Sequence, residues 1–102
     1  MNASVVEPAS AGWQVGRHAG LKMVYVYAIS SKSRAYIYVG LTHDLDKRLY
    51  EHNSGKNRTT RPYRPFRLVH FETFDTREEA RAREIYLKSG VGKEYLKKLA
   101  RK

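Results

Sequence analysis

The sequence predicts an α+β fold in which helices cover a three-stranded sheet, in the order ββαβαα. Two neighbouring runs rich in β-branched and aromatic residues are joined by a short polar turn, which is typical of a β-hairpin. A third such run follows later, and two segments begin with helix-capping residues and end at Ser-Gly pairs. A chain of 102 residues has room for one core, so we expect one domain.

The hairpin is expected to pair residues 24–29 with residues 36–41. If Ser30 pairs with Ala35, Tyr27 lies directly opposite Tyr38, and directly opposed residues project from the same face. The hairpin thus predicts a face rich in tyrosine. Tyrosine is common in strands, so the tyrosines taken alone favour a plain sheet surface over a functional site.

The first helix is expected to begin at a cap formed by Asp44 or Thr42, to run to about Asn53 and to end at Ser54-Gly55. A polar loop covers residues 54–66 and contains two prolines.

The third strand is expected at residues 67–74. A capping box at residues 76–79 begins the second helix, which Ser89-Gly90 ends. A short basic helix over residues 93–101 follows Gly92.

Charge points to a polyanionic partner. The chain has 20 Lys and Arg against 10 Asp and Glu, a formal net charge of +10, which indicates nucleic acid or an anionic membrane. Residues 1–22 contain only two of the basic side chains, Arg17 and Lys22, and read as a flexible N-terminal extension. The domain at residues 23–102 therefore carries almost all of the charge.

Two absences narrow the function further. The sequence has no cysteine, which excludes a disulfide scaffold, a thiolate zinc site and a cysteine nucleophile, and is typical of a cytoplasmic protein. The longest apolar run, residues 23–29, is too short to cross a bilayer. We therefore expect nucleic acid rather than a membrane as the partner.

Both predicted helices place charged or polar side chains on their apolar faces. Leu45, Leu49 and His52 fall within about 60° of one another on the first helix, with Arg48 at the edge of the stripe. A core histidine beside a snorkelling arginine would explain this pattern without any chemistry.

Glu84 lies on the apolar stripe of the second helix, between Ala80 and Leu87. A buried carboxylate is unfavourable unless it is paired or coordinates a cation. An ion pair with Arg83 or Lys88 is the simpler alternative.

The loop after the first helix is strongly basic. Aromatic residues, Tyr63 and Phe66, alternate with its cations, a combination that suits a phosphate backbone with exposed bases better than a membrane surface. A solvated basic loop is the alternative. The candidate DNA contacts are Lys56, Arg58, Arg61, Arg64 and Arg67.

Four short motifs in order resemble the GIY-YIG nuclease superfamily, in particular its small stand-alone bacterial members, and are similar to the N-terminal nuclease domain of the excinuclease C subunit. They are Tyr25-Val26-Tyr27, Tyr38-Val39-Gly40, the helix at residues 44–53, and Ala82-Arg83-Glu84. The resemblance covers about residues 23–100. It implies a three-stranded antiparallel sheet flanked by helices and metal-dependent hydrolysis of DNA phosphodiesters.

The resemblance also implies roles for individual residues. Tyr27 resembles the tyrosine that helps to activate the attacking water, and Tyr38 the tyrosine that positions water or phosphate. Arg48 is similar to the arginine that binds the scissile phosphate. His52 resembles a histidine, found in some members, that takes a proton from the first tyrosine.

Glu84 resembles the single glutamate that holds the divalent metal, and Gly40 the glycine that ends the second motif. Two departures stand out. Tyr25 replaces the glycine of the first motif. The polar residue, often asparagine, that follows the glutamate helix in many members has no counterpart here, since Ser89 is a poor substitute.

These residues predict a divalent-metal-dependent DNA endonuclease, with DNA repair or recombination as its setting. A free tyrosine has a pKa near 10, roughly three units above neutral pH. Ionising it at neutral pH therefore costs on the order of 4 kcal/mol, which a nearby guanidinium, cation and histidine could offset. One carboxylate suffices for Mg²⁺ or Mn²⁺ if water and substrate phosphate complete the shell. A non-catalytic nucleic-acid-binding module on the same fold, or a basic ribosome-associated protein, is the alternative. We expect a monomer, with a protein partner as one source of substrate specificity.

Overall fold

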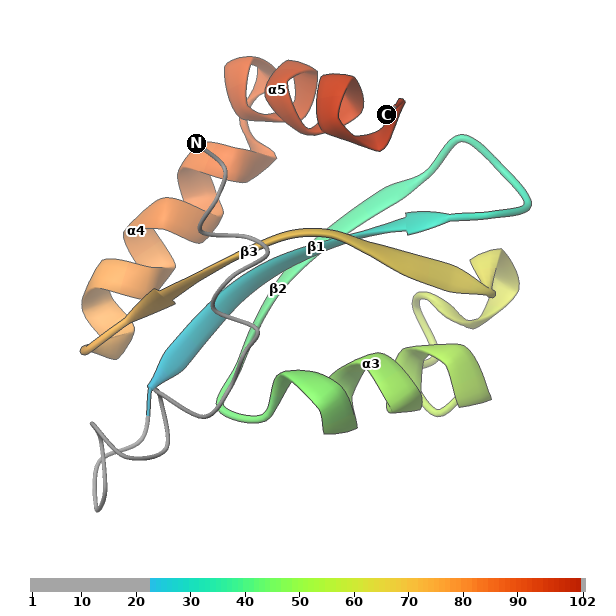
Figure 1. Ribbon diagram of the computed structural model, residues 1–102, viewed down its shortest axis with the longest axis horizontal. Coiled ribbons are helices and arrows are strands. Elements are labelled where there is room, and N and C mark those ends of the chain that lie inside the picture. Colours follow the sequence, from blue (N-terminus) through green and yellow to red (C-terminus); the bar gives the residue numbers. More distant parts are fainter. Residues whose placement is uncertain (1–22, 102) are drawn as a thin grey trace.

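A computed structural model describes residues 23–101 and contains one three-stranded antiparallel sheet (Figure 1). Its strands are β1 (Val24–Ser31), β2 (Ile37–Thr42) and β3 (Phe66–Phe74). The strand order is β2-β1-β3, so the first strand is central and pairs with both others. The sequence prediction of the fold class is confirmed.

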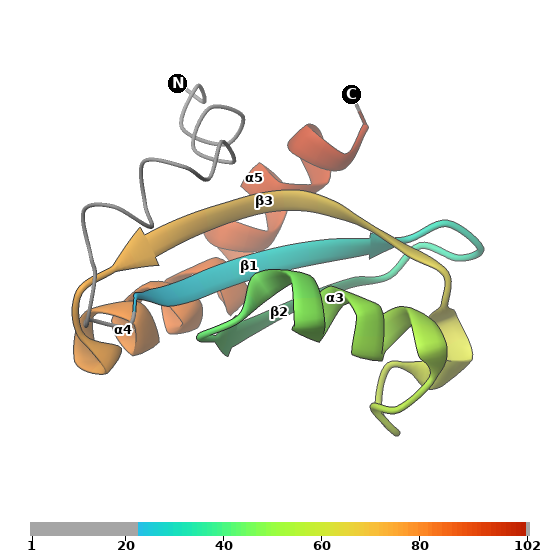
Figure 2. The ribbon, with the colours of Figure 1, turned by 60° about the horizontal axis from the view of Figure 1, so that its bottom comes forward.

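Helices lie on both faces of this sheet (Figure 2). Helix α3 (Leu45–Ser54) and the short 3₁₀ helix η2 (Arg61–Tyr63) lie on one face. Helices α4 (Arg77–Lys88) and α5 (Gly90–Ala100) pack on the other. The molecule thus has three layers, with the sheet in the middle.

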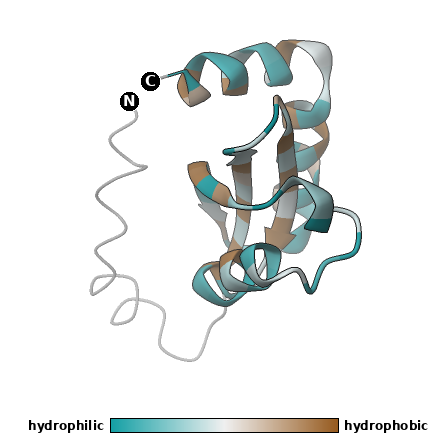
Figure 3. Ribbon diagram, turned by 90° about the vertical axis from the view of Figure 1, so that its right-hand side faces the viewer, coloured by the Kyte–Doolittle hydropathy of each residue, from teal (hydrophilic) through white to brown (hydrophobic). Residues whose placement is uncertain are grey.

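Each face of the sheet has its own core because alternate residues of a strand point to opposite faces. Val26 and Ala28 of β1 pack toward α4 and α5, whereas Tyr27 and Ile29 point toward α3. Both sets are fully or almost fully buried. Figure 3 shows the hydrophobic colours concentrated on the sheet, between helices that are mostly hydrophilic.

The hairpin register differs by two residues from the prediction. Tyr27 lies opposite Gly40, and Tyr38 lies opposite Ile29. Strand β1 extends two residues further than predicted because the Ser31 side chain organises the turn: its hydroxyl oxygen accepts hydrogen bonds from the backbone N–H groups of Ser33 and Arg34. A shift of two residues preserves the face of every side chain, so Tyr27 and Tyr38 still share one face.

The caps explain where the helices begin and end. Asp44 caps α3 by accepting from the Lys47 N–H, and Gly55 ends the helix at φ 85°. Thr76 caps α4 as predicted.

The last helix begins earlier than predicted. Ser89 ends α4 and also caps α5, which therefore includes Gly90 and Gly92. A Cβ at Gly92 would lie 2.2 Å from the Tyr86 carbonyl oxygen, so glycine permits the close approach of the two helices.

The predicted N-terminal extension at residues 1–22 lies outside the described residues. Within residues 23–101, none of the helices combines the length and apolar character that a membrane-spanning segment needs.

Candidate active site

A chain of two short hydrogen bonds lies between the sheet and α3. The Tyr27 hydroxyl is 2.8 Å from Nε2 of His52, and Nδ1 of His52 is 2.8 Å from Oγ1 of Thr60. Tyr27 is 1% exposed, and His52 and Thr60 are fully buried. The three residues come from β1, α3 and the loop that follows α3, so the tertiary fold alone brings them together.

Local structure fixes the histidine in this position. His52 lies on the same face of α3 as Leu45 and Leu49, which pack against the sheet. Asn53 secures the end of the helix to β3, because its side chain accepts from the Phe66 N–H at 2.6 Å and donates to the Phe66 carbonyl at 3.3 Å. The imidazole is therefore held between two rigid elements.

Tyr38 and Arg48 complete the group around this pair. The Tyr38 ring centre is 5.0 Å from that of His52 and 6.3 Å from that of Tyr27. The positive charge of the Arg48 guanidinium acts on the Tyr27 hydroxyl, whose pKa it lowers, and Arg48 donates to Glu51 at 3.0 Å. The Arg48 side chain is 33% exposed, so the cluster of Tyr27, His52 and Tyr38 is open to solvent on the side of Arg48.

The environment keeps this pair uncharged at neutral pH. Burial raises the pKa of Tyr27 to about 12, against the opposing effect of the Arg48 guanidinium. Burial, together with the positive charge of Arg48, lowers the pKa of His52 to about 4. The pKa of Tyr27 thus lies about five units above neutral pH, which corresponds to about 7 kcal/mol for ionising the hydroxyl. The difference for a free tyrosine is about three units.

Gly40 provides the space that the Tyr27 hydroxyl occupies. It lies opposite Tyr27 on β2, and a Cβ there would be 2.7 Å from the Tyr27 hydroxyl and 3.0 Å from the Tyr38 ring. Any larger residue would therefore displace one of the two tyrosines.

Glu84 approaches from the other face of the sheet. It is 6% exposed, on the side of α4 that packs with the core. Its carboxylate accepts from Arg81 at 2.6 Å and from Lys88 at 3.1 Å. Of the two ion-pair partners predicted, Lys88 is confirmed and Arg83 is wrong, because Arg83 binds Glu72 at 3.0 Å.

The structure does not bring Glu84 into the hydrogen-bonded group around Tyr27. The two are linked through electrostatics, since the negative charge of Glu84 contributes to the raised pKa of Tyr27.

The donor chemistry of Glu84 fits a hard divalent cation. A carboxylate oxygen is the ligand that Mg²⁺ prefers, and Mg²⁺ commonly retains several waters. Its present partners, Arg81 and Lys88, are 61% and 49% exposed, so both side chains can move into solvent. Residues 23–101 contain no group of three acidic or histidine side chains that could form a complete metal cage.

Four of the five basic residues proposed for DNA contact lie together in the loop after α3: Lys56, Arg58, Arg61 and Arg64 are all exposed. Arg67 is separated from them. It faces the α5 side of the sheet, where its guanidinium donates to the carbonyl of Ala100 at the end of α5.

The two aromatic residues of the loop are engaged within the protein. Phe66 is 3% exposed and belongs to the core. Tyr63 stacks on Tyr36, with ring centres 3.8 Å apart and planes at 9°. The Tyr36–Tyr63 stack fastens the loop to the hairpin and does not present a free ring to a base.

Two residues of the site, Thr60 and Asn53, were not predicted from the sequence. Nothing in the sequence distinguishes Thr60 from Thr59, although the first is buried and the second exposed. For Asn53 the sequence predicts only the end of α3. The Ser89 hydroxyl, which follows the glutamate helix, caps α5 and donates to the Tyr86 carbonyl at 2.6 Å.

Comparisons with known proteins identify the family of this chain. The model of the GIY-YIG catalytic domain matches residues 23–98. A UPF0213 protein of Haloquadratum walsbyi is 44% identical over 66 residues, 64% of this chain and 73% of that protein. A UPF0213 protein of Clostridium perfringens is 42% identical over 67 residues, 65% of this chain and 71% of that protein.

Among solved structures, the solution NMR structure of a UPF0213 protein from Bacillus halodurans is 40% identical, covers 76% of this chain and 84% of that chain, and has a TM-score of 0.46. The family match spans nearly all of the described residues and includes every candidate site residue. The chain belongs to the GIY-YIG family, a family of nucleases.

Proposed function

We propose that the protein is a divalent-metal-dependent DNA endonuclease that hydrolyses phosphodiester bonds. The observation that carries this proposal is the hydrogen bond of 2.8 Å between the Tyr27 hydroxyl and His52 Nε2, next to the guanidinium of Arg48. A buried phenol and imidazole must be paired, and this pair lies beside a guanidinium, a group that matches the geometry of a phosphate.

In this proposal Tyr27 relays a proton without becoming a free phenolate. Its oxygen accepts a proton from the attacking water while its own proton passes to Nε2 of His52. This concerted transfer avoids the cost of ionising a tyrosine whose pKa is about 12. His52 is neutral at pH 7 and therefore has a lone pair available for the proton.

Arg48 supplies both binding and activation. A guanidinium matches the geometry of a phosphate and forms two parallel hydrogen bonds with it. Arg48 now lowers the pKa of His52. A bound phosphate would offset that positive charge, so the pKa of His52 rises and the imidazole becomes a better proton acceptor when substrate is present.

Glu84 is the residue that would hold the metal. When bound, a divalent cation would polarise the phosphate and stabilise the leaving oxygen. Removing Arg81 and Lys88 from the carboxylate would leave two cations on the surface of α4 for the phosphate backbone. Tyr38, packed on His52, would orient the phosphate or the water.

The basic loop is the proposed DNA contact. Its four exposed cations lie directly after α3, the helix that bears Arg48 and His52. Neutralising phosphates along this loop would place a DNA strand next to Arg48.

A non-catalytic nucleic-acid-binding module is the second candidate. One observation favours it: both carboxylate oxygens of Glu84 already have cationic partners. In such a module Arg81 and Lys88 would stay on Glu84 and no metal would enter.

A nicking assay separates the two candidates. Supercoiled plasmid and branched DNA are incubated with the protein and Mg²⁺, Mn²⁺ or EDTA. We expect cleavage that EDTA abolishes and that Glu84→Ala removes while DNA binding survives. Glu94→Gln, a change at an exposed acid paired with Lys97, is the control and should retain cleavage. Cleavage that persists in Glu84→Ala would refute the metal assignment, and no cleavage with either metal would favour the binding module.

A further inference from the structure

We propose that Thr60 is a positioning residue that selects the tautomer of His52 needed for proton transfer. This inference rests on the proposed function, although its main test does not require cleavage. The hydroxyl oxygen of Thr60 would accept a hydrogen bond from Nδ1–H of His52 and leave Nε2 free to take the proton of Tyr27.

The Tyr27 hydroxyl has one proton to donate. Arginine is only a donor, so the Arg48 guanidinium, whose charge acts on this hydroxyl, cannot take the proton. The Tyr27 proton must then go to another group, and among residues 23–101 that group is His52 Nε2, 2.8 Å away. Nε2 is therefore the acceptor.

The proton of the neutral imidazole follows from this assignment. A neutral ring carries one N–H, and with Nε2 as acceptor that proton lies on Nδ1. The partner of Nδ1 is Thr60 Oγ1, at 2.8 Å. The other tautomer would place two donors, the Tyr27 hydroxyl and Nε2–H, against each other in a buried site.

The same contact suits the charged state of the histidine. After Nε2 takes the proton, both ring nitrogens are donors. Thr60 remains an acceptor throughout and needs no rearrangement. A hydrogen bond to the charged form stabilises it, so the Thr60 hydroxyl raises the proton affinity of His52 at the moment of transfer.

Thr60 is held firmly enough to act in this way. Its side chain is fully buried, its N–H donates to the Asn57 side chain at 3.2 Å, and its carbonyl accepts from the Tyr63 N–H at 2.9 Å. Its neighbours on the loop, Arg58 and Arg61, are exposed cations. The basic loop therefore connects its proposed DNA contacts directly to the proton acceptor.

The tautomer can be measured by NMR. Long-range nitrogen–proton correlation of the His52 ring distinguishes a protonated Nδ1 from a protonated Nε2. We expect protonated Nδ1 in the unaltered protein and in Thr60→Ser, which keeps the hydroxyl. In Thr60→Val, which lacks an acceptor, we expect the protonated Nδ1 form to decrease. Thr59→Val, a change at the exposed neighbour, should behave as the unaltered protein does.

Kinetics provide the second readout. We expect Thr60→Val to lower kcat about 10- to 100-fold with little change in KM, because positioned proton transfer contributes about 10²–10⁴-fold in total. Thr60→Ser should restore most of the rate.

A protonated Nε2 in the unaltered protein would overturn the inference even if Thr60→Val does not fold. So would a Thr60→Val protein that keeps both the protonated Nδ1 and full kcat. If the unaltered protein shows the expected tautomer but cleaves no DNA, the proposed function fails and the Thr60 contact stands.

Discussion

Gly40 lies opposite Tyr27 on the neighbouring strand, and the space beside its Cα is filled by the Tyr27 hydroxyl, 2.7 Å from where a Cβ would be. Because Gly40 has no side chain, the Tyr27 hydroxyl can lie beside the neighbouring strand. The relationship links the second motif of the sequence to the first through packing.

We predict that Gly40→Ala displaces the Tyr27 ring and breaks its hydrogen bond with His52. Overpacking of this kind lowers stability by about 1–3 kcal/mol. DNA cleavage should decrease more than DNA binding. Urea unfolding and the nicking assay measure the two effects.

Gly90→Ala is the matched control for that substitution, because nothing lies within 4 Å of a Cβ at Gly90. It should leave cleavage unchanged and stability within about 0.5 kcal/mol. Equal losses in both variants would show that Gly40 has no special relation to Tyr27.

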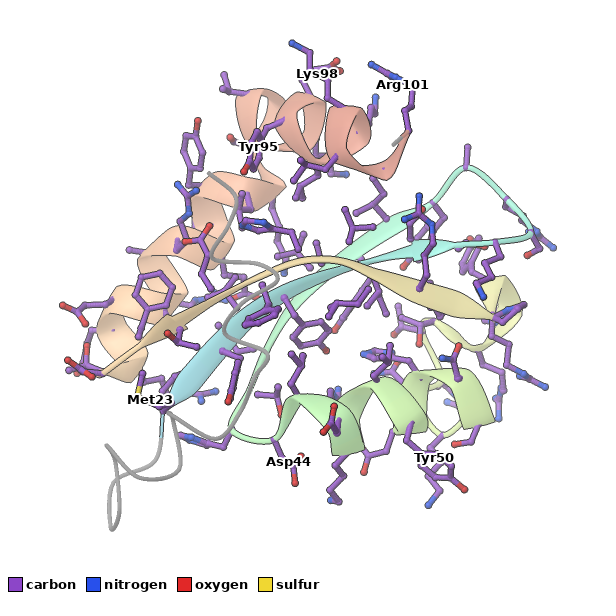
Figure 4. All side chains as sticks on the ribbon, viewed as in Figure 1. Met23, Asp44, Tyr50, Tyr95, Lys98 and Arg101 are labelled. Carbon is purple, nitrogen blue, oxygen red and sulfur yellow. The ribbon has the colours of Figure 1, made fainter. Side chains whose placement is uncertain are left out.

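We predict that Tyr27→Phe lowers kcat by about 10²–10⁴-fold, because the ring remains in the core and only the proton relay is lost. Stability should fall by about 1–3 kcal/mol, since Nε2 of His52 loses its partner. Tyr50→Phe removes a hydroxyl from an exposed tyrosine on the outer side of α3 (Figure 4) and should change neither quantity. Unchanged turnover in Tyr27→Phe would remove this residue from the mechanism.

We predict that changing Lys56, Arg58, Arg61 and Arg64 to glutamine weakens DNA binding and reduces its dependence on salt. Each lost phosphate contact lowers the slope of log Kd against log salt by about 0.9. Fluorescence anisotropy with labelled duplex DNA at several salt concentrations measures this slope.

The same loss of charge can be made on α5 as a control. Lys98 and Arg101 lie across the sheet from α3 (Figure 4), and glutamine there and at Lys93 and Lys97 removes four charges as well. The α5 variant should keep a steeper slope of log Kd against log salt than the variant of the basic loop. If the α5 variant shows the larger decrease, DNA binds on that face instead.

We predict that stability falls as the pH decreases from about 6.5 to about 4. The pKa of His52 is lowered from 6.5 to about 4 by burial and by Arg48, so in this interval the unfolded chain binds a proton that the folded protein does not. The stabilisation is complete above pH 6.5 and is lost as the pH falls through 4, about 3 kcal/mol in all.

Urea unfolding between pH 7 and pH 4 tests this prediction. His43→Gln, a change at an exposed histidine, should show the same pH dependence as the unaltered protein. His52→Gln should show a smaller one. A pH dependence that survives in His52→Gln would have to arise from another group.

The elements followed from the sequence because their signals are local. Asp44, Gly55 and Thr76 mark helix ends through hydrogen bonds and backbone angles within a few residues. The inward position of Arg48 and His52 also followed, since residues at this spacing share one face of a helix. The register of the hairpin did not, because the Ser31 side chain reshapes the turn.

Local signals along the chain were therefore enough to assign residues to helices and strands and to predict which side chains face inward. The packing of the layers was needed to show that His52 lies between Tyr27 and Thr60, that Arg67 binds the end of α5, and that Glu84 lies on the other face of the sheet from the Tyr27 side chain. These relationships join segments far apart in the chain. Periodicity and caps describe neighbours along the chain, whereas contacts between layers depend on how the layers pack.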